Sequence, residues 1–312
     1  MFVRSNKYNP PTANMKNVRH ILTIAALMFL AAGCAHESFV SRPAIHTAAG
    51  FQPQAGRTAE ESALIQKHCP FGEPKLTARV NFGPVEEVTY NGYVLVHSST
   101  DKIPLWVCEY IEARQLAGKA ERRDNFYPEP RLKAGERAEL SDYASSGYDR
   151  GHQAPAADYK SSQTLMDQSF SLANMAPQRP NLNRKIWQIL EDKARGWIKA
   201  GGEGYIITGP IFYDPAEDDA TTATGMVRHA VIGRDGVAVP THFYKIVLAK
   251  NSQGAWDAIA FVLPNLKKNQ PQVFEQHIVS IDWIEERTGI NFMPDLNSAE
   301  EERLERRAAN MW

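Results

Sequence analysis

The residues between Asp149 and Arg195 combine types that could carry out a reaction. Asp149 to His152 read DRGH, a run that favours neither a helix nor a core strand, so it suits some use other than packing. Further along, Asn183, Glu191 and Arg195 lie in the segment LNRKIWQILEDKAR. An imidazole, guanidinium groups, a carboxamide and carboxylates together suit hydrolysis of a phosphodiester.

That reaction needs a base, positive charge and help for the departing alkoxide. His152 has an ordinary pKa near neutrality, so it can remove a proton from attacking water. Arg150 and Arg195 can bind phosphate oxygens, because a guanidinium stays charged and forms two parallel hydrogen bonds. A divalent ion would stabilise the leaving oxygen as a Lewis acid.

Asn183 is the candidate metal ligand in this pattern. It offers a single neutral oxygen, so water and substrate would fill most of the coordination shell, which Mg²⁺ tolerates. Glu191 follows eight residues later, which in a regular helix is about 12 Å along the axis and about 80° around it. We therefore expect Glu191 to hold metal-bound water or to orient Arg195 rather than to touch the ion.

Each residue has a plainer interpretation when it is taken alone. His152 could be a structural histidine, Asn183 a helix cap, and Glu191 with Arg195 a solvated ion pair. The plainer readings stay open for the single residues. Their combination within 50 residues favours a catalytic site.

The flanking sequence indicates how these residues are positioned. Apolar runs at 90–98 and 103–111 are separated by SSTDK and predict a β-hairpin. A short strand is expected in SLANMAPQ, and a helix from about Asn181 or Asn183 to Gly201. The second half alternates apolar strands with Gly and Pro turns, and an amphipathic helix is expected around 279–287. This second half is therefore expected to be mostly sheet.

Composition limits the class of protein. The 312 residues are 43% hydrophobic, which excludes disorder for most of the chain. The formal net charge is −1, and it becomes −5 without the first 34 residues, which contain Arg4, Lys7, Lys16 and Arg19. Such a balance argues against a protein that coats nucleic acid through its overall charge, although it allows a local basic groove.

The first 34 residues predict a targeting segment. The apolar run 21–32 follows Lys16 and Arg19, is short for a membrane span and ends in small residues. LAAGC, ending at Cys34, resembles the lipobox of bacterial lipoproteins, so residues 1–34 are interpreted as a lipoprotein signal peptide with translation starting at Met15. This predicts a lipid on Cys34 and a bacterial cell envelope localisation, with outer membrane sorting. Ordinary secretion with Cys34 lost or unmodified is the alternative.

Residues 35–66 are rich in Ala, Ser, Gln, Thr and Pro, and predict a flexible tether before a folded domain at 67–312. Three cysteines are an odd number, but a lipidated Cys34 would leave Cys69 and Cys108 as a pair. We expect these two to form a disulfide in an oxidising compartment. The alternative is two buried free thiols.

YDRGHQAPAAD, SLANMAPQ and LNRKIWQILEDKAR resemble the DNA/RNA nonspecific endonucleases of the ββα-metal superfamily, particularly the endonuclease G branch with its bacterial relatives. The resemblance extends from about residue 93 to about residue 296. It implies an α+β fold with a mixed, mainly antiparallel central sheet, flanking helices and a ββα-metal finger. A homodimer is also frequent in the family.

The resemblance further implies roles for individual residues. His152 would be the general base, Asn183 the sole protein ligand of Mg²⁺ (with Mn²⁺ as a substitute), and Glu191 a support for the metal water shell. Arg150 and Arg195 would contact phosphate. The remaining candidates are Asn174, which would fix the histidine or a metal-bound water, Asp149 within the DRGH segment, and an upstream arginine, Arg123 or its neighbour Arg122.

These patterns predict an envelope-tethered, sugar-nonspecific endonuclease that hydrolyses DNA and RNA with one Mg²⁺. Backbone recognition would explain a lack of sequence preference. Two alternatives are a catalytically silent nucleic-acid-binding lipoprotein of the same fold, and a phosphodiesterase for a smaller envelope substrate.

Overall fold

The computed structural model describes residues 37–43, 56–77, 83–218, 221 and 224–312. The predicted signal peptide, with Cys34 and Met15, lies outside these residues, as does much of the predicted tether. Among the helices that are described, none combines the length and the apolar character needed to cross a membrane.

Strands and helical segments make up nearly equal parts of the regular structure among the described residues, and strands predominate in the second half, as the sequence predicts. The strands are β1 (Ser38–Pro43), β2 (Lys75–Leu76), β3 (Val85–Thr89), β4 (Val94–Ser98), β5 (Ile103–Glu112), β6 (Asp149–His152), β7 (Met175–Gln178), β8 (Glu203–Ile211), β9 (Met226–Ile232), β10 (Val237–Ala238), β11 (His242–Lys250), β12 (Trp256–Pro264), β13 (Ile278–Val279) and β14 (Ile290–Asn291). The α-helices are α1 (Ala59–His68), α2 (Leu140–Tyr143), α3 (Gln163–Gln168), α4 (Gln188–Gly201), α5 (Ile281–Thr288) and α6 (Ser298–Leu304). Shorter helical segments are η1 (Ala113–Leu116), η2 (Ala156–Tyr159), η3 (Leu172–Asn174), η4 (Leu182–Trp187), η5 (Pro215–Asp218) and η6 (Phe274–His277).

The largest sheet in the described part of the chain has seven strands in the order β13-β12-β11-β8-β5-β4-β3. All its neighbouring strands are antiparallel. The hairpin predicted from 90–98 and 103–111 is confirmed as β4 and β5, in a register that shifts at a bulge between Val96 and His97. The predicted α+β class with a mainly antiparallel sheet is therefore confirmed.

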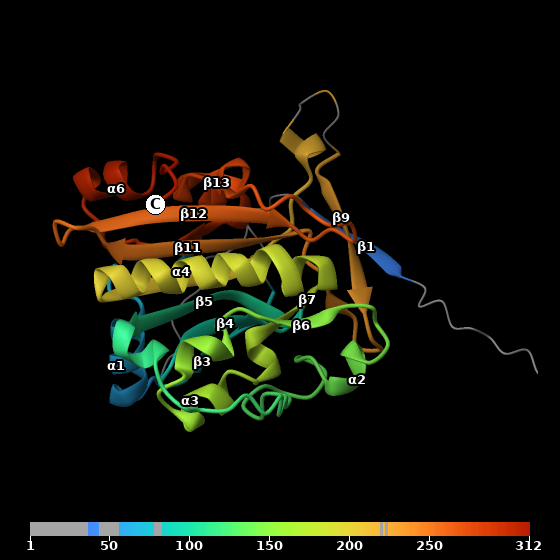
Figure 1. Cartoon of the computed structure of the whole chain (residues 1–312). Helices are drawn as coiled ribbons and strands as arrows, with labels where there is room; N and C mark the ends of the chain where they lie inside the picture. The colour runs from blue at the N-terminus through green and yellow to red at the C-terminus, as the bar shows by residue number, and fades with distance from the viewer. Residues whose placement is uncertain (1–36, 44–55, 78–82, 219–220, 222–223) are drawn as a thin grey trace, which may run out of the picture. The chain divides into compact units, whose positions relative to one another are not determined.

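Helices cover both faces of this sheet. On one face lies α4, which runs along the strands in Figure 1 and packs Leu190, Ala194 and Ile198 against sheet residues such as Phe243 and Phe261. On the other face, the core includes residues of α1, α5 and α6 together with the opposite side chains of the same strands. The expected helix around 279–287 is confirmed as α5. Alternation of apolar residues along the strands thus supplies two cores.

The predicted tether differs from the structure in two places. Within 35–66, β1 pairs antiparallel with β9, from Ser38 opposite Val231 to Arg42 opposite Val227. The helix α1 begins with a capping box, in which Thr58 and Glu61 bond each other's backbone nitrogens. The composition of this segment is low in large apolar residues, but strand pairing uses backbone groups and a helix needs only one apolar face. Composition alone could not detect either element.

The predicted disulfide is also corrected. Cys69, just after α1, and Cys108, on β5, are free thiols in the structure, and both are buried. They lie in the same apolar core and interact with each other, and burial together with the neighbouring Cys69 thiol raises the pKa of Cys108. The pair therefore behaves as two small hydrophobic side chains, as the alternative interpretation holds.

Candidate active site

The DRGH segment forms β6, one strand of a two-stranded antiparallel ribbon with β7. Asp149 lies opposite Gln178, and His152 lies opposite Met175. At Gly151 any β-carbon would collide with the side chain of Gln178, so the glycine is required for space. The chain continues from β7 into η4 and α4, so the predicted catalytic residues of β6, η4 and α4 lie on successive elements.

A π-helical turn, η4, separates this ribbon from α4. Neither asparagine acts as the predicted helix cap: Asn181 occupies the first position without a capping bond and instead donates its side-chain amide to the carbonyl of Lys267. A π-helix closes i to i+5 hydrogen bonds, so each residue turns through a smaller angle than in an α-helix. The separation of about 80° expected between Asn183 and Glu191 in a regular helix is reduced accordingly. Such wide turns are frequent at functional sites.

His152 is held in an apolar slot. The residue is only 8% exposed, and its ring lies 5.6 Å from that of Phe126 and 5.0 Å from that of Phe170, between centroids. Its Nε2 is buried without a hydrogen-bond partner among the described residues. Burial, reinforced by Arg122 and Arg150, lowers the pKa of His152 to about 3. The imidazole is therefore neutral at physiological pH.

Asn183 is fixed by the carboxylate of Asp149. Its Nδ2 donates to Asp149 Oδ2 at 2.9 Å, and the same carboxylate accepts from Nε of Arg184 at 2.8 Å. Because amide nitrogen and oxygen lie on opposite sides of the side-chain group, Oδ1 of Asn183 is directed away from Asp149. Asp149 thus positions Asn183, a function that the sequence pattern did not reveal.

A polar crevice of about 330 Å³ lies over these residues. Its lining consists of Arg122, Phe126, Tyr143, Tyr148, Asp149, Arg150, Asn183 and Arg184. Arg150 lies 4.2 Å above the ring of Phe126, and Arg122 lies 5.1 Å from that of Phe170. No carboxylate among the described residues pairs with Arg150. Arg150 thus keeps its donors for an anion.

Asn174 has a structural position. Its Nδ2 donates to the carbonyls of Ala154 and Ser169, each at 2.9 Å, and its Oδ1 accepts from the backbone nitrogen of Ala154 at 2.9 Å. The buried amide is hydrogen-bonded through both its nitrogen and its oxygen, which fits the predicted role of fixing the histidine better than the predicted contact with metal-bound water. Asn174 fixes the backbone two residues beyond His152.

Arg195 is likewise committed to other groups. Its guanidinium donates to Asp158 and to Asp192, each at 2.6 Å, and the residue is 9% exposed. A guanidinium enclosed by two carboxylates has little positive potential left for phosphate. The predicted phosphate contact of Arg195 is therefore corrected to a structural ion pair.

Glu191 lies on α4, four residues before Arg195, and interacts electrostatically with Lys245, Arg195 and Asp158. It is half-buried, and burial raises the pKa of Glu191 to about 7, against the lowering effect of Lys245 and Arg195. A carboxyl with such a pKa can exchange a proton near neutrality. Glu191 does not line the crevice itself.

Of the two candidates for the upstream arginine, Arg122 is the one that lies at the crevice. Arg122 lines the crevice, whereas Arg123 is paired with Asp167 at 3.8 Å and is largely exposed. Sequence reasoning also missed Arg184 and the two phenylalanines around His152. Arg184 could have been found from its position beside Asn183, but the packing of Phe126 and Phe170 against the imidazole depends on the tertiary structure.

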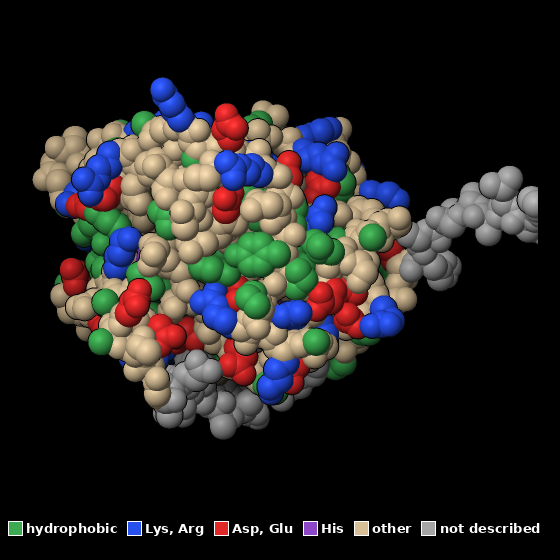
Figure 2. All heavy atoms as spheres, turned by 90° about the horizontal axis from the view of Figure 1, so that it is seen from below, with side chains coloured by type: hydrophobic (Ala, Val, Ile, Leu, Met, Phe, Trp, Pro, Cys, Tyr) green, Lys and Arg blue, Asp and Glu red, His purple; other side chains and the backbone are tan. Residues whose placement is uncertain are grey.

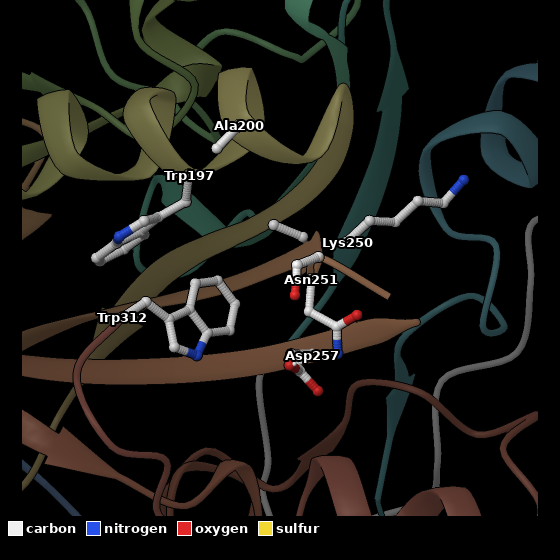
Figure 3. A pocket seen from close by; sticks show the side chains of 8 residues that line it. Trp197, Ala200, Lys250, Asn251, Asp257 and Trp312 are labelled. Atoms are coloured by element: carbon white, nitrogen blue, oxygen red, sulfur yellow. Dashed lines mark hydrogen bonds between the residues drawn. The ribbon is translucent and has the colours of Figure 1, made fainter. Parts of the chain in front are cut away.

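A second cavity, of about 310 Å³, lies far along α4 from η4 and is shown in Figure 3. Trp197 and Trp312 form much of its wall, with Lys250, Asn251 and Asp257 at its polar side (Figure 3). These polar groups are already engaged, because Asn251 donates to Asp257 at 3.0 Å and Lys250 pairs with Glu203. The cavity therefore lacks a free base or anion-binding group.

The surface charge agrees with a local rather than a general basic site. On the face viewed in Figure 2, basic and acidic side chains are interspersed with apolar ones. Of the basic residues of the crevice, Arg122 and Arg184 pair with Asp124 and Asp149 at the crevice itself. Positive charge available to a ligand is therefore concentrated at Arg150 and its surroundings.

Known proteins of similar sequence are nucleases. Mitochondrial endonuclease G of Homo sapiens is 36% identical over 205 residues, which cover 65% of this chain and 68% of that protein. A nuclease of Syncephalastrum racemosum is 35% identical over 79% of this chain and 82% of its own length. The mitochondrial nuclease of Saccharomyces cerevisiae is 34% identical over 79% of this chain.

These names correct the predicted localisation. The prediction of a lipid-anchored protein in a bacterial cell envelope is contradicted, because the relatives from human, cattle, zebrafish and yeast are named mitochondrial. A lipobox-like sequence is short and composed of common small residues, so it is a weak basis for localisation.

The fold and the family agree with the site. A crystal structure of the EndoG/EndoGI complex contains a chain that superposes with a TM-score of 0.67 and 26% identity, covering 80% of this chain and 96% of that one. The family model for DNA/RNA non-specific endonucleases matches residues 74–299, which include the whole crevice. The chain therefore belongs to the DNA/RNA non-specific endonuclease family.

Proposed function

We propose that the protein is a Mg²⁺-dependent endonuclease that hydrolyses DNA and RNA with His152 as general base. The observation that carries this proposal is a neutral, buried imidazole beside a crevice in which Arg150 and Asn183 have polar atoms free for a ligand. A base, an anion site and a carbonyl oxygen are the three requirements of phosphodiester hydrolysis.

The residues present fit a magnesium ion. Asn183 is the residue that would hold it, because its amide nitrogen is committed to Asp149 and its oxygen is left for a cation. Hard oxygen ligands are those that Mg²⁺ prefers, and it commonly keeps several waters. When bound, the ion supplies Lewis-acid stabilisation of the leaving oxygen. Mn²⁺ is expected to substitute.

The remaining roles follow from the contacts of each side chain. His152 accepts the proton of attacking water, since its pKa of about 3 keeps it unprotonated before the reaction. Arg150 and Arg122 bind the phosphate oxygens from above the rings of Phe126 and Phe170. Glu191, with its pKa near 7, assists ordered water near the crevice.

Such a site recognises the sugar-phosphate backbone. Contacts to phosphate position a nucleic acid without reading base edges, so little sequence preference is expected. Binding through a few arginines also predicts that affinity falls with salt concentration. DNA and RNA are both substrates in this proposal.

The test is cleavage of supercoiled plasmid and of RNA by the full chain, in Mg²⁺ and in EDTA. We expect cleavage of both substrates in Mg²⁺, none in EDTA, and a loss of about 10²–10⁴-fold for His152→Ala. A matched control is His229→Ala, because His229 is also a buried histidine but contacts Phe212 outside the crevice.

Two outcomes would replace the proposal. Binding of plasmid by the wild type without any cleavage in Mg²⁺ or Mn²⁺ would favour a silent nucleic-acid-binding protein. Turnover of a small chromogenic diester without cleavage of plasmid or RNA would favour a phosphodiesterase. The homodimer implied by the family resemblance stays a prediction, which sedimentation equilibrium of the full chain would test.

A further inference from the structure

Three carboxylates converge at the carboxyl-terminal end of the fold, away from the crevice. Asp282 and Glu285 are three residues apart on α5 and therefore share one face of that helix. Glu305 is the residue that ends α6. One oxygen from each of the three lies within 4.8 Å of the others.

This carboxylate cluster is built into the fold rather than spread on the surface. Glu305 is 4% exposed, and its Oε1 is buried without a hydrogen-bond partner in the part of the chain that the structure describes. The backbone nitrogen of Asp282 donates to the carbonyl of Glu305 at 3.2 Å, which fixes α6 against α5. Oε1 of Glu285 accepts from the backbone nitrogen of Phe292 at 2.7 Å, which fixes that side chain too.

No ion pair among the described residues neutralises this carboxylate cluster. The charge of Arg306 partly offsets the raised pKa of Asp282 and of Glu305, but the ion pairs of Arg306 are with Glu301 and Glu302. Three close carboxylates without a counterion repel one another at a cost that burial increases. The pKa values of Glu285 and Glu305 are raised to about 7 and about 8, chiefly by burial.

We propose that Asp282, Glu285 and Glu305 bind a calcium ion. Calcium takes carboxylate oxygens at about 2.3–2.6 Å, so two of its ligands on opposite sides are about 4.6–5.2 Å apart. Three oxygens within 4.8 Å of one another can therefore share one calcium ion with little movement. Magnesium, at about 2.0–2.1 Å, would require a tighter octahedral arrangement, and three carboxylates without neutral ligands suit it less.

The proposed site is separate from the nuclease chemistry. Apolar residues of α5 and α6 belong to the core on one face of the large sheet, whereas α4 and the residues after β7 belong to the core on the other face. The ion would connect α5 to α6 and hold the carboxyl-terminal helix, which lies near β12 in Figure 1, against the sheet. Its effect is therefore on stability rather than on turnover.

The experiment is thermal unfolding and calorimetric titration of the full chain after removal of metal with EDTA. We expect CaCl₂ to raise the Tm of the wild type by several degrees in a saturable way, with a smaller effect of MgCl₂ at the same concentration. The Asn183→Ala variant should show the same rise, which separates this site from the proposed crevice metal. Glu305→Gln should abolish the rise, whereas Glu275→Gln, which removes an exposed carboxylate from η6, should not.

Folding of the variant is itself part of the test. Glu305→Gln removes repulsion, so without calcium it should be at least as stable as the wild type. If it fails to fold, Asp282→Asn at the half-buried position takes its place with the same expectation. The proposal is overturned if calcium leaves the Tm of the wild type unchanged, if the rise persists in the Glu305 and Asp282 variants, or if it disappears in Asn183→Ala.

Discussion

The crevice around Arg150 and the buried network around Arg195 contain similar charged residues in opposite settings. In the crevice, Arg150 is stacked on Phe126 and has no carboxylate partner among the described residues. In the network, Arg195 is enclosed by Asp158 and Asp192. The first guanidinium can respond to a ligand, whereas the second already balances buried protein charge.

The network extends well beyond Arg195. Glu109 on β5 accepts from the hydroxyl of Tyr159 at 2.7 Å, and Lys245 on β11 donates to Thr208 at 2.6 Å, all in the buried interior. Burial raises the pKa of Glu109 and lowers that of Lys245, so the network sits in a low-dielectric region. Arg150 and Arg195 are the same residue type, and they differ in how many carboxylates already pair with them. The number of these carboxylate partners therefore distinguishes a charge available to a ligand from a structural one.

The largest expected effect comes from breaking the network. Arg195→Ala leaves Asp158 buried without its partner and should lower the free energy of unfolding by about 3–5 kcal/mol. Urea denaturation would measure this loss. Arg195→Lys should recover part of it, and a variant as stable as the wild type would show that Arg195 is free for substrate after all.

In the crevice, Asn183→Ala should lower plasmid cleavage by about 10²–10³-fold, because loss of the metal ligand removes several kcal/mol of stabilisation. The free energy of unfolding of this variant should change little. Asn181→Ala is the matched control two residues away, since that side chain bonds Lys267 outside the crevice. Equal losses of cleavage rate in both variants would indicate that catalysis depends on the conformation of η4 rather than on the side-chain oxygen of Asn183.

Arg150→Ala should lower kcat/KM by about 10–100-fold, the equivalent of one charge-assisted contact to phosphate, with no loss of stability. Arg195→Ala is expected to lose stability, whereas Arg150→Ala is expected to lose catalytic rate and to keep its stability. Initial rates on plasmid, with urea denaturation alongside, would measure both quantities. A variant that loses stability but keeps its rate would place Arg150 with the structural charges.

A smaller difference is expected between two adjacent arginines. Arg122→Ala should lower kcat/KM by about tenfold or less, because Arg122 lines the crevice but also pairs with Asp124. Arg123→Ala should have almost no effect, since its side chain points to Asp167 on α3. The ratio of the two rates would decide which residue is the upstream arginine.

The last prediction concerns the pH dependence of stability. The folded-state pKa of His152 is about 3, compared with 6.5 ordinarily, so below pH 6.5 only the unfolded chain gains this proton. His152 therefore disfavours folding increasingly as pH falls from 6.5 towards 3, by about 1.4 kcal/mol per pH unit. Urea denaturation at about pH 7, 5.5 and 4.5 should show His152→Asn losing less stability than the wild type. Parallel losses would mean that the imidazole is solvated.

The sequence predicted the β4–β5 hairpin, the α5 helix and the family correctly, because apolar periodicity and the DRGH motif are local patterns. It could not predict which arginine is free, since the carboxylates beside Arg195 come from η2 and from the same helix. The π-helical turn at Asn183 was missed as well, because no composition signal distinguishes it from a regular helix. The tether prediction depended on the composition of residues 35–66, whereas the disulfide prediction depended on a localisation inferred from the first 34 residues.

The central claim is that His152 and Asn183 serve one reaction at one site. The most direct measurement is the rate of plasmid cleavage by the double variant His152→Ala/Asn183→Ala, compared with each single variant under saturating Mg²⁺. Residues that act as a unit give strongly non-additive losses, so the double variant should be little slower than the slower single variant. The account would be contradicted if the fold-loss in rate of the double variant equalled the product of the two single losses. It would also be contradicted if either single variant cleaved plasmid at nearly the wild-type rate.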